Sequence, residues 1–186
     1  MKQSRLKWGR SYHIYNRGNN RGQIFFEVEN YAYFLKMYKK YMANLAVLYA
    51  YCLLPNHFHL LLRINDEGEH IKTGEGMVST RFGTFLGTYV KAINARYKRT
   101  GSLFEGRYQK VEIGSENQFF ITLVYIHQNP QKHGYVESFQ SWRYSSYTNY
   151  AENNPGDLIS SVLFRDPSTY DSIMELHEIN TQDAGS

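Results

Sequence analysis

The stretch LLPNHFHLLLRI, residues 53–64, sets two histidines one residue apart inside a strongly apolar run. An apolar run of this length is typical of a buried β-strand, in which successive side chains point to opposite faces of the sheet. His57 and His59 would then share one face, while Phe58 points to the other. Two interpretations fit: solvated strand histidines, or two ligands of one metal ion, because imidazole is a common metal ligand. The pair alone does not decide between them.

The residues on either side of this stretch predict how the strand is paired. Residues 46–55 read as another strand, and the Pro55-Asn56 turn joins it to residues 57–64 as a hairpin. Further strands are predicted over 11–17 and 108–113. Apolar residues recur at helical spacing in two other segments, which predicts amphipathic helices over 29–45 and 77–98.

The resulting order of elements is β-α-β-β-α-β, which is the ferredoxin-like split βαβ arrangement of the α+β class. It consists of one antiparallel sheet with two helices on one face. The first and third strands are central, so His57 and His59 would lie at the start of a central strand. A further helix, capped by Ser115, is predicted to run through about His127, where Asn129-Pro130 stops it. This helix could cover the remaining face of the sheet.

Two glycine features are also informative. The polar, glycine-rich segment 65–76 is predicted to be a mobile loop between the third strand and the second long helix. Gly83 and Gly87 lie four residues apart within that helix. Since glycine weakens a helix, this spacing predicts close packing against a neighbouring element.

The composition of the 186 residues narrows the class of protein. Cys52 is the only cysteine, so an intramolecular disulfide and a cysteine metal cluster are excluded, which fits a reducing cytoplasm. No apolar run approaches the length of a membrane span, and no apolar segment follows the basic N-terminus as in a secretory signal. We therefore expect a cytoplasmic protein that does not associate with membranes.

Basic and aromatic residues are interleaved along the chain, which carries a formal net charge of +4 and 17 tyrosines. Cations neutralise phosphates and aromatic rings stack on bases, so this pattern suits single-stranded nucleic acid. A solvated basic surface would give the same counts.

The predicted third helix carries one polar stripe. Gln118, Thr122, Tyr125 and Asn129 follow one another at spacings of four, three and four, which places them on one side of the helix. If this side faces the two strand histidines, Tyr125 and Asn129 meet any metal ion that the histidines hold. Taken by itself, one tyrosine among 17 is more simply explained by a structural role.

Four motifs occur in order and carry a resemblance to a known family. They are PNHFHLLL (55–62), GSLFEGRYQ (101–109), YIHQNPQKHGYV (125–136) and SWRYSSYTNY (141–150). The chain resembles the REP-associated branch of the single-tyrosine HUH transposases, relatives of the insertion-sequence-200-like transposases. The resemblance runs from about Tyr12 to Tyr150. We therefore expect one HUH transposase-like domain over 1–150, and a C-terminal extension over 151–186 that is partly packed and frayed at its end.

The resemblance implies a role for each motif residue. His57 and His59 correspond to the metal ligands, Tyr125 to the nucleophile, and Asn129 to the polar residue that completes the metal site. His127, two positions from Tyr125 on a helix, should point away from that face. Imidazole ligands alone would favour zinc or another late transition metal. The resemblance instead implies Mg²⁺ or Mn²⁺, which an amide oxygen and open water positions suit.

The implied activity is that of a single-stranded DNA endonuclease and strand transferase, a transposase that acts through a 5′-phosphotyrosine intermediate. The expected partner is single-stranded or hairpin DNA, and no obligate protein partner is evident. Related transposases are dimers, whereas members of the REP-associated branch resemble monomers, so either a monomer or a homodimer is expected. The cations that would contact DNA are predicted to be Arg17, Arg21, Arg96, Arg99, Arg107 and Lys110.

Two other classes of function remain. A nucleic-acid-binding protein of the same fold that has lost cleavage would have no need of His57, His59 and Tyr125 together. A metal-dependent phosphohydrolase of small molecules would more often offer several carboxylate ligands, and the sequence shows no such cluster.

Overall fold

The structure is a computed structural model that describes residues 5–66 and 76–182. Its centre is a four-stranded antiparallel sheet with the strand order β2-β3-β1-β4. The predicted α+β, ferredoxin-like arrangement is confirmed, with the first and third strands in the centre of the sheet. The strands are β1 (Ser11–Arg17), β2 (Ala46–Leu54), β3 (His57–Ile64) and β4 (Gln109–Ile113).

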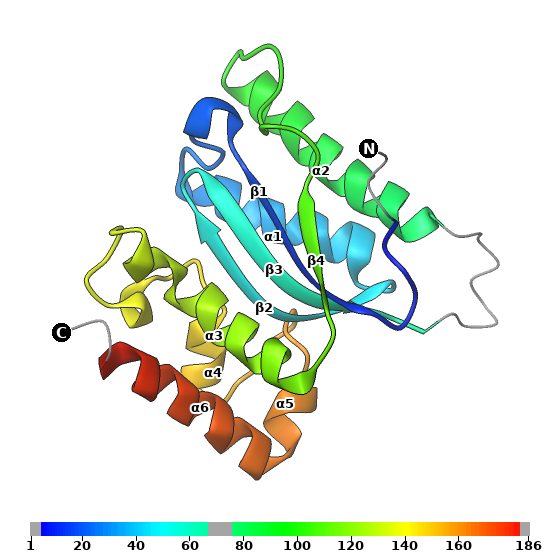
Figure 1. The fold of residues 1–186 in the computed structure, drawn as a ribbon. Coiled ribbons are helices and arrows are strands. Elements are labelled where there is room, and N and C mark those ends of the chain that lie inside the picture. The colour runs from blue at the N-terminus through cyan, green and yellow to red at the C-terminus, as the bar shows by residue number, and fades with distance from the viewer. Residues whose placement is uncertain (1–4, 67–75, 183–186) are drawn as a thin grey trace.

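Two long helices cover one face of the sheet (Figure 1). They are α1 (Val28–Met42) and α2 (Met77–Arg96). Between them and the sheet lies an aromatic core in which the Phe34 ring of α1 contacts Phe58 of β3 at 5.1 Å and Phe85 of α2 at 4.8 Å between centroids. Because Phe58 points into this core, strand alternation turns its neighbours His57 and His59 to the opposite face.

The opposite face of the sheet is covered by α3 (Glu116–Lys132) (Figure 1). Its N-terminus is the predicted one, because the Ser115 hydroxyl accepts the Gln118 backbone N–H at 3.2 Å. Phe119 of α3 contacts the ring of Tyr49 on β2 at 4.9 Å between centroids, which fixes this helix against the sheet.

The predicted end of α3 is wrong. The helix does not stop before Asn129 but continues through Pro130 to Lys132. Proline removes only its own N–H, so a single bond to the Ile126 carbonyl is lost. The next turn still forms, because the His133 N–H donates to the Asn129 carbonyl at 3.0 Å. Asn129 therefore lies inside the helix, on the same side as Tyr125.

Beyond α3 the chain folds back on the helix itself. Its last long helix, α6 (Pro167–Gln182), packs against α3 on the side away from the sheet (Figure 1). The predicted division into 1–150 and 151–186 stays a prediction. No helix in the part of the chain that the structure describes is long and apolar enough to cross a membrane. The remaining elements are η1 (Asn19–Arg21), η2 (Phe139–Ser141), α4 (Tyr147–Ala151), α5 (Val162–Arg165) and α6 (Pro167–Gln182).

Three predictions concern glycine-rich segments and the chain end. Most of the predicted loop at 65–76 lies outside the described residues, as do residues 183–186 of the end predicted to be frayed from Asn180, whereas α6 continues through Gln182. The predicted close packing at Gly83 and Gly87 is wrong, since a Cβ added to either would meet no atom within 4 Å. Among the described residues, packing therefore does not require the absence of a side chain at either position.

We therefore expect Gly83→Ala and Gly87→Ala to stabilise the protein by about 0.5–1 kcal/mol each. Alanine restricts the unfolded chain and favours the helix, and at both positions it enters open space. Urea unfolding of each variant measures the change. Gly18→Ala is the control of opposite sign, because its Cβ would lie 1.9 Å from the Gly22 carbonyl oxygen. Destabilisation by either helix substitution would contradict the prediction.

Candidate active site

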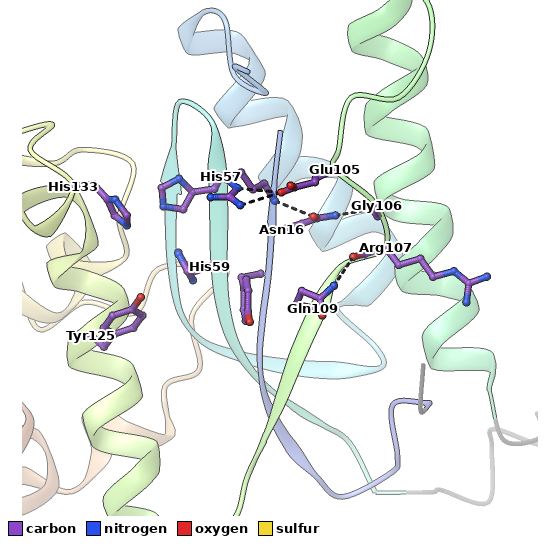
Figure 2. Close-up of a pocket in the computed structure, with 11 residues that line it drawn as sticks. Asn16, His57, His59, Glu105, Gly106, Arg107, Gln109, Tyr125 and His133 are labelled. Carbon is purple, nitrogen blue, oxygen red and sulfur yellow. Dashed lines mark hydrogen bonds and ion pairs between the residues drawn. The ribbon is translucent and has the colours of Figure 1, made fainter. Parts of the chain in front are cut away.

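A pocket of about 380 Å³ lies between the central strands, α3 and the loop that precedes β4. Figure 2 shows Tyr125 and His133 projecting from α3 toward the strand that carries His57 and His59. The opposite wall belongs to the loop 105–107. The residues that line the pocket are Tyr15, Asn16, Arg17, His57, His59, Glu105, Gly106, Arg107, Gln109, Tyr125 and His133.

The register of β3 sets the two histidines side by side. His59 lies between Tyr15 of β1 and Cys52 of β2, and His57 begins the strand. Their ring centroids are 5.2 Å apart, with the rings nearly perpendicular. Because β3 is paired on both sides, the sheet holds the backbone that carries both histidines.

Tyr125 reaches the same place from α3. Its ring centroid lies 5.9 Å from that of His59 and 6.0 Å from that of His13, in edge contacts. The residue remains 38% exposed and lines the pocket. The Lys132 ammonium lies 5.0 Å from the centroid of the Tyr125 ring and adds positive charge beside it.

Asn129 lies one turn further along α3, and its hydrogen bonds fix its orientation. Its Nδ2 donates to the Tyr125 carbonyl at 3.0 Å, which leaves Oδ1 buried without a hydrogen-bond partner. His57 is fixed in a similar way, because its Nδ1 lies 2.6 Å from Asn56 Oδ1. Since Asn56 Oδ1 is an acceptor, His57 Nδ1 carries the proton. The buried, unpartnered Nε2 of His57 is then a bare lone pair.

Unpaired buried acceptors cost free energy, and a cation would satisfy both of them. An amide oxygen and two neutral imidazoles form a donor set that suits a divalent metal ion, and the hydrogen bond to His57 Nδ1 is the usual support for a ligating histidine. Among the described residues, no three His, Cys, Asp or Glu side chains are grouped to hold a metal. The unpartnered Asn129 Oδ1 is a further oxygen atom that could join the two imidazoles.

Burial keeps His57 and His59 uncharged near neutral pH. It lowers the pKa of His57 to about 4, an effect that His133 and Arg17 reinforce and the nearby Asn129 amide opposes. Burial, followed by the neighbouring His13, lowers the pKa of His59 well below its ordinary value. Neutral imidazole is the form that binds metal, so the site needs no proton release from these rings near neutral pH.

Sequence reasoning missed His13. Its Nε2 lies 2.8 Å from His59 Nδ1, and the two rings are stacked at 5.1 Å between centroids. This contact fixes the plane of the His59 ring from the neighbouring strand. His13 has the same strand parity as Tyr15, the cross-strand partner of His59, so the register of the two strands could have indicated it. His133, also missed, caps α3 at its C-terminus and contacts His57 at 4.7 Å between centroids.

His127 points away from the site, as predicted. It is completely buried on the other side of α3, where its ring nitrogens contact His177 and Ser146. It does not approach the His57 and His59 rings.

The six predicted DNA-contacting cations are divided between different parts of the surface. Arg17 and Arg107 line the pocket, and Arg17 also pairs with Glu105 at 3.1 Å. Lys110 lies on the other face of the sheet, where its ammonium is 4.8 Å from the Tyr12 ring centroid. The predicted cations that do not line the pocket are Arg21, Arg96, Arg99 and Lys110.

No protein-family model matches the chain. A protein of Haemophilus influenzae with the provisional name REP-associated tyrosine transposase is 31% identical over 101 residues, which are 53% of this chain and 57% of that protein. The structure of a REP-associated tyrosine transposase bound to a REP hairpin matches over 86% of this chain and 87% of that one, with a TM-score of 0.62 and 17% identity.

The predicted resemblance to the REP-associated tyrosine transposases is confirmed. The sequence match spans little more than half of the Haemophilus influenzae transposase, while the structural match to the hairpin-bound transposase shows a shared fold over most of both chains. A structure from Deinococcus radiodurans, provisionally assigned as a transposase, aligns with a TM-score of only 0.41 at 18% identity over 74% of this chain and 96% of that chain, and supports no conclusion.

The buried neutral histidines predict a loss of stability in acid. Burial lowers the pKa of His177 to about 4, whereas the unfolded chain takes up the proton near pH 6.5. Stability from such a group is present above pH 6.5 and is lost as the pH falls toward 4. For the pKa values of His177, this loss should be on the order of 2 kcal/mol between pH 7 and pH 5. Urea unfolding in EDTA at both pH values measures this loss, and equal stability would contradict it.

Proposed function

We propose that this protein is a metal-dependent single-stranded DNA endonuclease and strand transferase that acts through a phosphotyrosine intermediate on Tyr125. One observation carries the proposal: Tyr125 of α3 contacts His59 in a pocket that His57 also lines, and His57 Nε2 and Asn129 Oδ1 are buried acceptors without hydrogen-bond partners. The name of the Haemophilus influenzae relative supports a transposase, and the REP hairpin bound to the similar structure supports hairpin DNA as the substrate.

His57, His59 and Asn129 would hold the metal ion. We infer Mg²⁺ or Mn²⁺, because an amide oxygen and free coordination positions suit a hard ion. When bound, the ion supplies positive charge that polarises the non-bridging oxygens of the scissile phosphate. His13 keeps His59 in its ligating orientation through the 2.8 Å contact to Nδ1, and Asn56 does the same for His57.

Tyr125 supplies the nucleophile. Its phenolic oxygen attacks the phosphorus, so that an O–P bond to tyrosine forms and the bond to the 3′ oxygen of the preceding nucleotide breaks. The leaving oxygen ends as a 3′-hydroxyl, and the proton lost by the phenol balances it. The ester to Tyr125 retains the energy of the original phosphodiester. A 3′-hydroxyl can therefore attack it in turn and join two strands without a nucleoside triphosphate.

The cations around the pocket bind the backbone of the strand. Arg17 and Arg107 lie on the walls opposite α3, and Lys132 lies beside the nucleophile. Each can neutralise a phosphate next to the scissile one, which positions the strand for in-line attack. The open, 38% exposed position of Tyr125 suits a single strand, whose backbone can bend into the pocket.

The ligand assignment predicts that His57→Ala weakens Mn²⁺ binding by about 100-fold or more, because it removes one of three protein ligands. Calorimetry with Mn²⁺ on the folded variant measures the affinity, and circular dichroism checks the fold. His133→Ala is the matched control, because His133 contacts His57 but is not a ligand. A loss in His133→Ala as large as that in His57→Ala would contradict the assignment.

The nucleophile assignment predicts that Tyr125→Phe abolishes a covalent protein–DNA adduct. The protein is incubated with Mn²⁺ and end-labelled, hairpin-bearing single strands drawn from the sequence that flanks its gene, then denatured in detergent. The wild type should retain the 3′-side fragment on Tyr125, because tyrosine becomes linked to the 5′-phosphate. Tyr33→Phe is the control, since Tyr33 belongs to α1, on the other face of the sheet from the site.

Three outcomes of this assay would count against parts of the proposal. An adduct that persists in Tyr125→Phe would assign the nucleophile to another tyrosine. Equal labelling of blunt duplex and of its separated strands would exclude a preference for single strands. Tight binding of the hairpins without any adduct in the wild type would favour the alternative, a catalytically inactive DNA-binding protein of the same fold.

A further inference from the structure

A buried histidine chain, formed by Ser146, His127 and His177, lies on the side of α3 away from the pocket. All three side chains are almost completely inaccessible, with exposed fractions of 0%, 0% and 1%. His127 Nε2 lies 2.7 Å from the Ser146 hydroxyl, and His127 Nδ1 lies 2.8 Å from His177 Nε2. The proposed reaction uses none of these groups.

The proton positions in the buried histidine chain follow from the hydrogen bond that His177 makes to the backbone of α6. His177 Nδ1 lies 2.8 Å from the Ile173 carbonyl, which only accepts, so His177 Nδ1 carries a proton. In a neutral ring His177 Nε2 is then an acceptor, and His127 Nδ1 must donate to it. His127 Nε2 is left as an acceptor for the Ser146 hydroxyl, which itself accepts the Tyr51 backbone N–H at 2.9 Å. Burial lowers the pKa of both histidines, which keeps them neutral.

The buried histidine chain ties four elements together. It begins at the backbone of β2, passes through the start of α4, crosses α3 and ends in α6. Both ring nitrogens of His127 are hydrogen-bonded. One contacts Ser146, which is itself bonded to β2, and the other contacts His177 of α6. A rotation of α3 about its axis would therefore break hydrogen bonds at both ends of the same ring.

We propose that His177 is a positioning residue for the nucleophile: its hydrogen bond to His127 sets the rotation of α3 and so holds Tyr125 and Asn129 toward His57 and His59. The inference rests on the proposed function for its catalytic consequence. Side-chain atoms lie about 6 Å from a helix axis, so a rotation of about 10° displaces them by about 1 Å. A displacement of this size in a reacting group can cost about 100-fold in rate.

A packing role for His177 is the competing explanation, and the structure makes it distinguishable. The His177 ring contacts Phe139, Tyr147 and His127 at 5.9, 5.2 and 5.0 Å between centroids. His177→Phe keeps the ring and removes the acceptor for His127. His177→Gln removes the ring and keeps an acceptor near the position of Nε2. The two explanations therefore predict opposite orders for these variants.

The experiment measures adduct formation at saturating oligonucleotide and at a temperature well below the Tm of each variant. His177→Phe should slow adduct formation by about 10- to 100-fold while oligonucleotide affinity stays within about threefold. His177→Gln should remain within about threefold of the wild type. Glu175→Ala, on the exposed side of α6, is the control for a substitution in this helix and should match the wild type.

A second measurement keeps the inference separate from the proposed function. 3-Fluorotyrosine placed at position 125 reports the surroundings of that ring by its ¹⁹F signal, whether or not DNA is cleaved. The signal should shift or split in His177→Phe and stay at the wild-type position in His177→Gln. A wild type without adduct would overturn the proposed function alone. A wild-type ¹⁹F signal in His177→Phe, or a disturbance in His177→Gln as large as that in His177→Phe, would overturn the positioning role.

Discussion

The alternation of side chains along β3 is the constraint on which the rest of the structure depends. The strand is paired on both sides, so its side chains can only face α1 and α2 or face α3. Phe58 enters the aromatic core on the first face, and its burial there commits His57 and His59 to the second. A slip of one residue would exchange the two sets, burying imidazoles in the core and exposing phenylalanine. The same hydrophobic contact that stabilises the domain therefore places the site.

The polar groups on the two sides of α3 differ in whether they have hydrogen-bond partners. On the side toward α6, every ring nitrogen of His127 has a partner, and the hydrogen-bond network is complete. On the side toward the sheet, His57 Nε2 and Asn129 Oδ1 have none. A fold selected only for stability would pair or replace such groups, because each costs about 1–3 kcal/mol when buried without a partner. Other described side chains, Gln128 Nε2 of α3 among them, are also buried without a partner, so what distinguishes these two acceptors is that they lie beside the pocket that Tyr125 lines.

Features of the fold and site that depend on local sequence pattern could be predicted. Strand alternation predicted the shared face of His57 and His59, and helical spacing predicted the common side of Tyr125 and Asn129. What failed depends on contacts between distant segments. Pro130 is tolerated because the turn after it still finds acceptors, and the open space beside Gly83 cannot be read from spacing. His13 becomes visible only once the register of β1 on β3 is known, since their separation along the chain hides their contact.

The position of Asn129 explains why α3 must continue past its proline. If the helix ended at His127, the Asn129 side chain would leave the side of the helix that carries Tyr125, and its Nδ2 could not reach the Tyr125 carbonyl. Continuing the helix costs one backbone hydrogen bond at Pro130. Asn129 Nδ2 then donates within the helix, and Asn129 Oδ1 is left pointing toward His57. Pro130 and Asn129 are thus adjacent in the last turns of α3. Pro130 removes one backbone hydrogen bond, and Asn129 leaves one side-chain oxygen without a partner.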